Sequence, residues 1–91
     1  MQYHVVTFTH TKIFGWAVYL HAHVKYLKKL LKEDKLQISG PYVNNPLAGL
    51  SILSVADAAA ANAIMKADPF VEKLGAAYQV IEWNPKFGDF K

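Results

Sequence analysis

Two histidines stand close together in the segment LHAHVKYLKK, residues 20–29, and a tyrosine and three lysines follow them. Histidine binds metal ions and transfers protons near neutral pH, so both kinds of chemistry have to be considered. On a helix, His21 and His23 would point about 200° apart, whereas chelation from one helix needs a spacing of i, i+3 or i+4. The apolar spacing of this segment is helical, and we therefore expect no metal site.

The two histidines would have different neighbours on such a helix. His21 falls in register with a polar stripe made of Lys25, Lys28 and Lys32, which is typical of a solvated face. His23 falls beside Leu27 and Leu30 and borders the buried face. Two interpretations of His23 follow. It is either a rim histidine whose hydrogen bonds are satisfied within the protein, or a general acid or base.

The elements around these histidines can be predicted from periodicity and turn residues. Strands are expected at 3–10, 35–39, 49–55 and 77–83, and helices at 17–34 and 58–67. Residues 11–16 would form a connection that bends at Gly15, and 42–49 a loop after Gly40-Pro41 stops the second strand. The buried stripe of the first helix is expected to contain Leu20, Val24, Leu27 and Leu31.

The ends of the second helix carry clear signals. Asp57 is a good N-cap, and Pro69 should end the helix. Asp68 and Pro69 would then cap a short turn over 70–74 that stops at Gly75.

The resulting order β-α-β-β-α-β predicts an α+β, ferredoxin-like fold, in which an antiparallel sheet carries two helices on one face. The other face of the sheet would be apolar and uncovered. Such a face predicts a partner, and a homodimer, open to higher assembly, is the simplest one.

The composition limits the class of protein. The 91 residues make one domain over 1–91, with a core at about 3–84 and a polar tail at 85–91. The chain has no cysteine, which excludes a disulfide framework, a thiol nucleophile and Cys-ligated metal sites. No signal peptide is recognisable, and no run approaches the roughly 18 apolar residues that span a bilayer. We expect a cytoplasmic protein without membrane contact.

The charged residues argue against a nucleic-acid partner. The net charge is +3, and all ten basic residues are lysine, whereas arginine is the preferred residue for phosphate and guanine recognition. An RNA-recognition domain shares the βαββαβ order but carries aromatic residues on its third strand. Residues 49–55, GLSILSV, contain none.

Four short motifs occur in order along the chain. They are H-x-x-Y-L (His23 to Leu27), S-G-P (Ser39 to Pro41), D-P-F (Asp68 to Phe70) and I-E-W (Ile81 to Trp83). With them the sequence resembles the YciI-like family over roughly residues 3–84. The resemblance implies a dimeric α+β barrel, in which two ferredoxin-like sheets close against each other. The wider superfamily includes muconolactone isomerase and small ring-oxidising monooxygenases, which implies a small cyclic or aromatic substrate.

The resemblance also implies a His–Asp pair, which in this chain is His23 and Asp68. Asp68 has a second interpretation as a helix cap, whose loss typically costs about 1 kcal/mol, and the two roles are compatible. Further candidates for contact with a substrate are Ser39, Gly40, Tyr26 and Tyr42. Glycine permits close approach of a ligand to the backbone, and the other three carry hydroxyl groups that could equally shape a loop or pack.

Other chemistry-bearing residues have weaker signals. His4 and His10 share a strand face but lie roughly 20 Å apart along it, so they cannot form a pair. Lys12 and Trp16 could line the mouth of a pocket.

Two functions remain open at this point. The first is a small enzyme in which His23 moves a proton during elimination, isomerisation or hydrolysis, with Asp68 orienting it and no cofactor. The second is a non-catalytic module that binds a small molecule in the same cleft.

Overall fold

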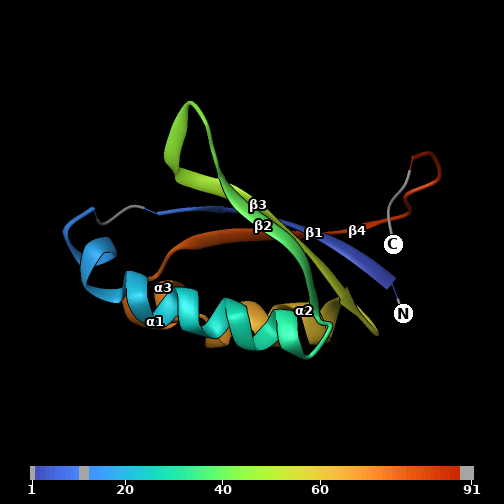
Figure 1. Cartoon of the computed structure of the whole chain (residues 1–91), viewed down its shortest axis with the longest axis horizontal. Coiled ribbons are helices and arrows are strands. Elements are labelled where there is room, and N and C mark those ends of the chain that lie inside the picture. The colour runs from blue at the N-terminus through green and yellow to red at the C-terminus, as the bar shows by residue number, and fades with distance from the viewer. Residues whose placement is uncertain (1, 11–12, 89–91) are drawn as a thin grey trace.

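The computed structural model of the chain describes residues 2–10 and 13–88, apart from the side chains of Ile13 and Phe14. The elements are β1 (Gln2–Thr9), α1 (Ile13–Lys32), β2 (Leu36–Tyr42), β3 (Asn45–Val55), α2 (Ala58–Ala67), α3 (Pro69–Leu74) and β4 (Ala77–Trp83). Figure 1 shows the strands in one layer with all the helices packed against the same face. This arrangement confirms the predicted α+β, ferredoxin-like fold, with the short α3 inserted between α2 and β4.

The sheet of the described residues has the strand order β2-β3-β1-β4 and is antiparallel throughout. Side chains alternate between its faces, so Val6 is completely buried against the helices while Val5 points the other way. On the uncovered face, an apolar row crosses all four strands through Ile38, Ile52, Val5 and Ile81. Ile38 is 58% exposed and Ile81 is 51% exposed. The predicted uncovered apolar face is therefore present.

The core lies between the sheet and the helices. Its buried cluster consists of Val6, Leu30, Leu36, Leu53, Val55, Ala61 and Met65. On α1 the predicted buried stripe is only partly confirmed. Leu27 packs against this cluster, but Leu30 is the buried leucine, and Val24 and Leu31 are 39% and 48% exposed. The polar side chains of His23 and Tyr26 both find hydrogen-bond partners on the α2–α3 segment, and these bonds fix the rotation of α1 about its axis.

Helix α1 begins earlier than the sequence indicates. We expected a connection through Trp16 with a bend at Gly15, but Gly15 lies within the first turns of the helix. A Cβ atom at Gly15 would lie 3.2 Å from Cδ1 of Leu74 and closer still to Cδ2. The glycine thus lets α1 approach α3 closely, and this packing outweighs its poor helix propensity.

The predicted loop at 42–49 is mostly strand. Strand β2 continues through Gly40 and Pro41 to Tyr42, and β3 already begins at Asn45. Proline has no N–H group to donate, but it is tolerated in β2 because this strand lies at the edge of the sheet and pairs with a neighbour on one side only. In Figure 1 the tip of this hairpin rises beyond the rest of the sheet.

The predicted ends of α2 and α3 agree with the structure. The carboxylate of Asp57 accepts a hydrogen bond from the Ala60 N–H group at 2.8 Å and caps α2. Gly75 ends α3 in the left-handed conformation, with φ of 66°, as glycine readily does. Among the described residues, no helix has the length and apolar character that crossing a membrane requires.

The crowded position of Gly49 gives a first prediction. A Cβ atom there would press on the Gly40 carbonyl oxygen and lie 2.6 Å from Cζ of Phe8 and 2.9 Å from Cα of Pro41. We expect Gly49→Ala to lower the free energy of unfolding by about 1–3 kcal/mol, because backbone atoms must shift. The measurement is urea unfolding followed by circular dichroism.

Gly40→Ala is the matched control, since a Cβ atom at Gly40 has no neighbour within 4 Å. Gly40→Ala should leave the midpoint of urea unfolding almost unchanged. Equal midpoints for the two variants would contradict the proposed crowding at Gly49.

Candidate active site

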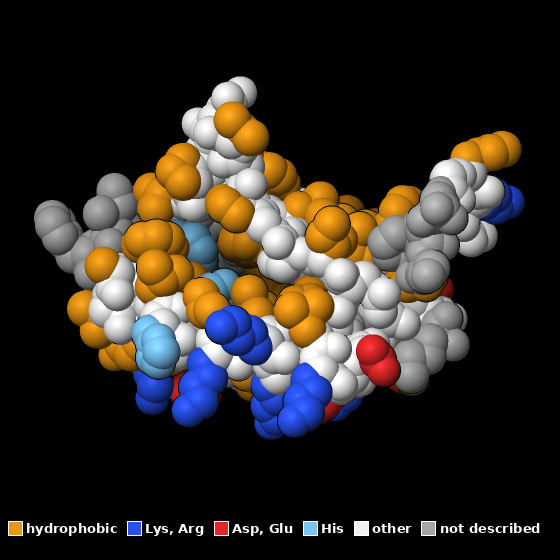
Figure 2. All heavy atoms as spheres, viewed as in Figure 1, with side chains coloured by type: hydrophobic (Ala, Val, Ile, Leu, Met, Phe, Trp, Pro, Cys, Tyr) orange, Lys and Arg blue, Asp and Glu red, His pale blue; other side chains and the backbone are white. Residues whose placement is uncertain are grey.

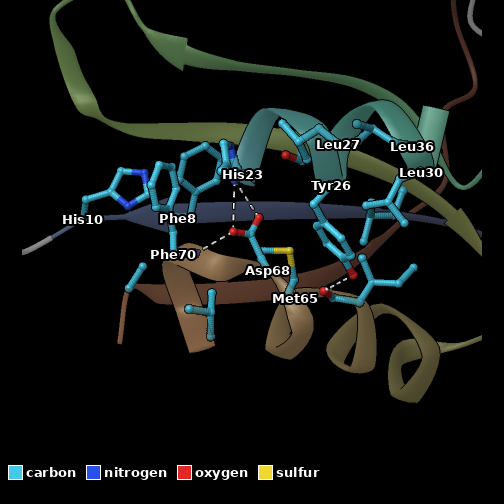
Figure 3. A pocket seen from close by; sticks show the side chains of 15 residues that line it. Phe8, His10, His23, Tyr26, Leu27, Leu30, Leu36, Met65, Asp68 and Phe70 are labelled. Atoms are coloured by element: carbon cyan, nitrogen blue, oxygen red, sulfur yellow. Dashed lines mark hydrogen bonds and ion pairs between the residues drawn. The ribbon is translucent and has the colours of Figure 1, made fainter. Parts of the chain in front are cut away.

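His23 and Asp68 come from different elements and meet below the sheet. His23 projects from the middle of α1, and Asp68 lies between α2 and α3. Nδ1 of His23 lies 2.9 Å from Oδ2 and 3.0 Å from Oδ1 of Asp68 (Figure 3). The side chains are 14% and 5% exposed, respectively. The two residues that the family resemblance singled out are thus brought into direct contact.

Asp68 also holds the helix junction together. Its Oδ1 accepts a hydrogen bond from the Phe70 N–H group at 2.8 Å, which caps α3. Its own N–H group donates to the Met65 carbonyl oxygen at 3.1 Å and closes α2. Capping and contact with His23 therefore coexist in one carboxylate, as the sequence analysis allowed.

The protonation pattern of His23 follows from this geometry. An ionised carboxylate can only accept hydrogen bonds, so Nδ1 must carry the proton that it shares with Asp68. In the neutral ring, Nε2 is then the acceptor. Within the described part of the chain Nε2 has no hydrogen-bond partner. A neutral His23 is therefore equipped to accept a proton at Nε2.

Aromatic rings surround the His23 imidazole. Phe70 stacks on His23 with ring centroids 4.2 Å apart, and Trp16 lies 6.2 Å beyond Phe70 in a similar plane. His10, at the end of β1, meets Phe70 edge-on at 4.4 Å. Burial lowers the pKa of His10, and nearby His23 lowers it further against a weaker opposing effect of Asp68.

Two adjoining cavities lie beside these residues. The inner one, of about 20 Å³, has room for little more than a water molecule and reaches Asp68, Tyr26 and Ser51. The outer cleft, of about 320 Å³, matches a small organic molecule. It is lined by Phe8, His10, Trp16, Leu20, His23, Val24, Leu27, Ser39, Gly40, Pro41, Pro46 and Phe70. Figure 2 shows histidine atoms inside a hollow with a mainly hydrophobic rim.

The other predicted contact residues fall at different places. Ser39 and Gly40 line the cleft, and the Ser39 hydroxyl is hydrogen-bonded to that of Ser51 at 2.7 Å. The Tyr26 hydroxyl donates to the Ile64 carbonyl oxygen at 2.7 Å, and burial raises its pKa, so it ties α1 to α2. Tyr42 is 42% exposed and lies outside both cavities.

Several remaining residues can now be placed. Trp16 lines the cleft as suggested, whereas Lys12 lies outside the described residues. His4 is fully buried and lines neither cavity. His21 is exposed on the lysine face of α1. Among residues 2–10 and 13–88, no three His, Asp or Glu side chains gather as a metal site would require.

Sequence reasoning missed His10 as a site residue. The alternation of β1 already placed it on the same face as Phe8, which was the available signal. Its proximity to His23 depends on how α1 crosses β1, and no local pattern encodes that crossing.

The double role of Asp68 predicts an unusual loss of stability. Asp68→Ala removes a cap and leaves the Nδ1–H group of His23 without an acceptor, so we expect unfolding to become easier by about 2–4 kcal/mol. Asp57→Ala removes only a cap and should cost about 1 kcal/mol. Denaturant unfolding of both variants measures the difference. Equal losses would show that the contact with His23 contributes no stability.

Comparison with known proteins supplies the family. A search of curated proteins finds no significant match. A solved structure of 5-chloro-2-hydroxyhydroquinone dehydrochlorinase (TftG) from Burkholderia phenoliruptrix AC1100, in complex with 2,5-dihydroxybenzoquinone, superposes with a TM-score of 0.71. The likeness covers 89% of this chain and 93% of that chain at 18% identity, which supports the fold. Residues 17–84 match the YCII-related domain. The chain therefore belongs to the YCII-related family.

Proposed function

We propose that this protein is a small enzyme in which His23 transfers a proton to and from a ring-shaped, oxygen-bearing substrate, with Asp68 orienting it. The observation that carries the proposal is the bond from Nδ1 of His23 to a carboxylate that is 5% exposed. This bond directs Nε2 away from Asp68, and the His23 side chain lines the outer cleft. A general base needs such an oriented, accessible nitrogen.

The surroundings of the dyad suit proton transfer. When Nε2 accepts a proton, the imidazolium that forms is stabilised by the adjacent Asp68 carboxylate, and burial strengthens this attraction. Phe70 covers one face of the His23 ring and limits contact with water. The apolar cleft wall suits the body of a ring, while Ser39 and the imidazoles offer hydrogen bonds to its substituents.

Among the possible reactions, elimination of hydrogen chloride has additional support. The structurally similar protein is a dehydrochlorinase, captured with a hydroxylated quinone. In such a step the ring first moves one hydroxyl proton to the chlorine-bearing carbon, which becomes tetrahedral in this keto tautomer. Nε2 then takes the proton of a second hydroxyl group, whose O–H electrons form a C=O bond and shift the adjacent C=C bond towards the C–Cl carbon. Chloride leaves with the pair of the C–Cl bond, and the imidazolium then returns its proton to water. The step balances without an oxidant or a cofactor.

The test is chloride release from 5-chloro-2-hydroxyhydroquinone under anaerobic conditions. We expect turnover by the wild type and a loss of about 10²–10⁴-fold in kcat for His23→Gln, which has no basic ring nitrogen. Asp68→Asn keeps a capping oxygen but not the charge, and should also lower kcat. His21→Gln is the matched control and should retain full activity, because His21 lies on the solvated face.

Two outcomes would contradict this proposal in different ways. No chloride release by the wild type would exclude elimination from this substrate. Turnover that survives in His23→Gln would exclude His23 as the base. Binding of 2,5-dihydroxybenzoquinone without turnover of any substrate would support the non-catalytic binding module.

We also propose that two copies pair through the uncovered face of the sheet. The apolar row from Ile38 to Ile81 crosses every strand and is more than half exposed at both ends, and such exposed apolar side chains favour association. A two-fold symmetric contact buries the same row on both copies. The family resemblance implies the same arrangement.

Sedimentation velocity measures this directly. The wild type should sediment as a dimer, and Ile81→Glu as a monomer, because a charge within the apolar row would be buried without a partner. Val18→Glu, which changes a 72% exposed residue of α1, should remain dimeric. A monomeric wild type, or a dimeric Ile81→Glu variant, would contradict the proposed interface.

A further inference from the structure

We infer that His10 is a second ligand-binding imidazole of the cleft. It forms a hydrogen bond with an oxygen substituent of a ring-shaped ligand, on the side of the ligand away from His23. The ligand class is a flat ring that carries two hydroxyl or carbonyl oxygens, one for each histidine. This inference rests on the proposed function for the identity of the site, but it concerns binding and is tested without turnover.

The first support is the position of His10. It is 7% exposed and lines both the inner cavity and the outer cleft. Its ring lies 4.4 Å from Phe70 and 5.4 Å from Phe8, measured between centroids. Because Phe70 also stacks on His23, both imidazoles contact one aromatic ring, and both line the outer cleft (Figure 3). They therefore border the same space from two elements, β1 and α1.

The second support is an unsatisfied polar group. Nδ1 of His10 is buried and has no hydrogen-bond partner among the described residues. Burial of a polar atom without a partner is costly, and such atoms are uncommon in folded proteins. Buried histidines usually bond to the backbone or to a carboxylate, as His23 does with Asp68. Among the described residues His4 is also buried without a side-chain partner, but it lines neither cavity, so only at His10 does this unused hydrogen-bonding capacity lie beside the cleft.

The third support is the charge of the site. Burial lowers the pKa of His10, so its ring is neutral at pH 7 and can donate from one nitrogen and accept at the other. The titratable groups that face it are His23 and Asp68, which are bonded to each other. No described residue of the cleft is a lysine, and the chain has no arginine. Hydroxyl and carbonyl oxygens suit these walls better than a carboxylate does.

The test compares hydroquinone and phenol, which differ by one ring oxygen. Equilibrium binding to the full chain is followed by NMR titration at pH 7. The wild type should bind hydroquinone about three- to tenfold more tightly than phenol, the usual worth of one hydrogen bond. In His10→Phe, which keeps an aromatic ring of similar shape, this preference should vanish while phenol affinity stays the same.

Two further variants keep the result interpretable. His21→Phe makes the same change on the solvated face and should keep the wild-type preference. His10→Asn retains a hydrogen-bond donor and an acceptor at this position. It should keep part of the preference for hydroquinone over phenol, even if His10→Phe folds poorly.

Three results would overturn the inference. They are an equal affinity of the wild type for both rings, a preference that persists in His10→Phe, and no binding of either ring at millimolar concentration. Failure of the proposed function looks different, because His23→Gln would then leave turnover unaffected, whatever the ring preference is.

Discussion

A buried carboxylate must find hydrogen-bond donors, and much of this structure follows from how Asp68 finds them. The residue is 4% exposed, and the described part of the chain places no lysine against it. Its donors are the Phe70 N–H group and Nδ1 of His23, at 2.8 and 2.9 Å. One bond fixes the corner between α2 and α3, and the other fixes α1 to that corner. Removing either donor would leave a charge buried with too few partners.

The cleft is a consequence of the same anchoring. With His23 held by Asp68, and Tyr26 held by Ile64 one turn further along, α1 presents Leu30 to the core. The flank that carries Leu20 and Val24 is then left facing the β2–β3 hairpin, and this apolar flank forms a wall of the cleft. The incompletely buried side of α1 is in this way part of the site.

Close packing completes the opposite wall. Gly49 of β3 lies between Phe8 of β1 and Pro41 of β2, and the missing side chain leaves room for the Phe8 ring, which lines both cavities. Phe8 in turn packs beside His10. The position of His10 thus depends on a glycine that is distant in sequence, through contacts that are purely steric. Conformational freedom is not the reason for glycine at this position.

The sequence by itself determined those features that depend on interactions between residues close together in the chain. Asp57 and Gly75 mark helix ends because capping acts within one turn, and strand alternation assigned the faces of β1 because its period is two. The contact between His23 and Asp68 was suggested only by family resemblance, since the residues are separated by 45 positions. Tertiary structure decided the rest, including the rotation of α1, the strand through Pro41 and the approach of His10. These depend on long-range packing and on hydrogen bonds between elements, which no local pattern specifies.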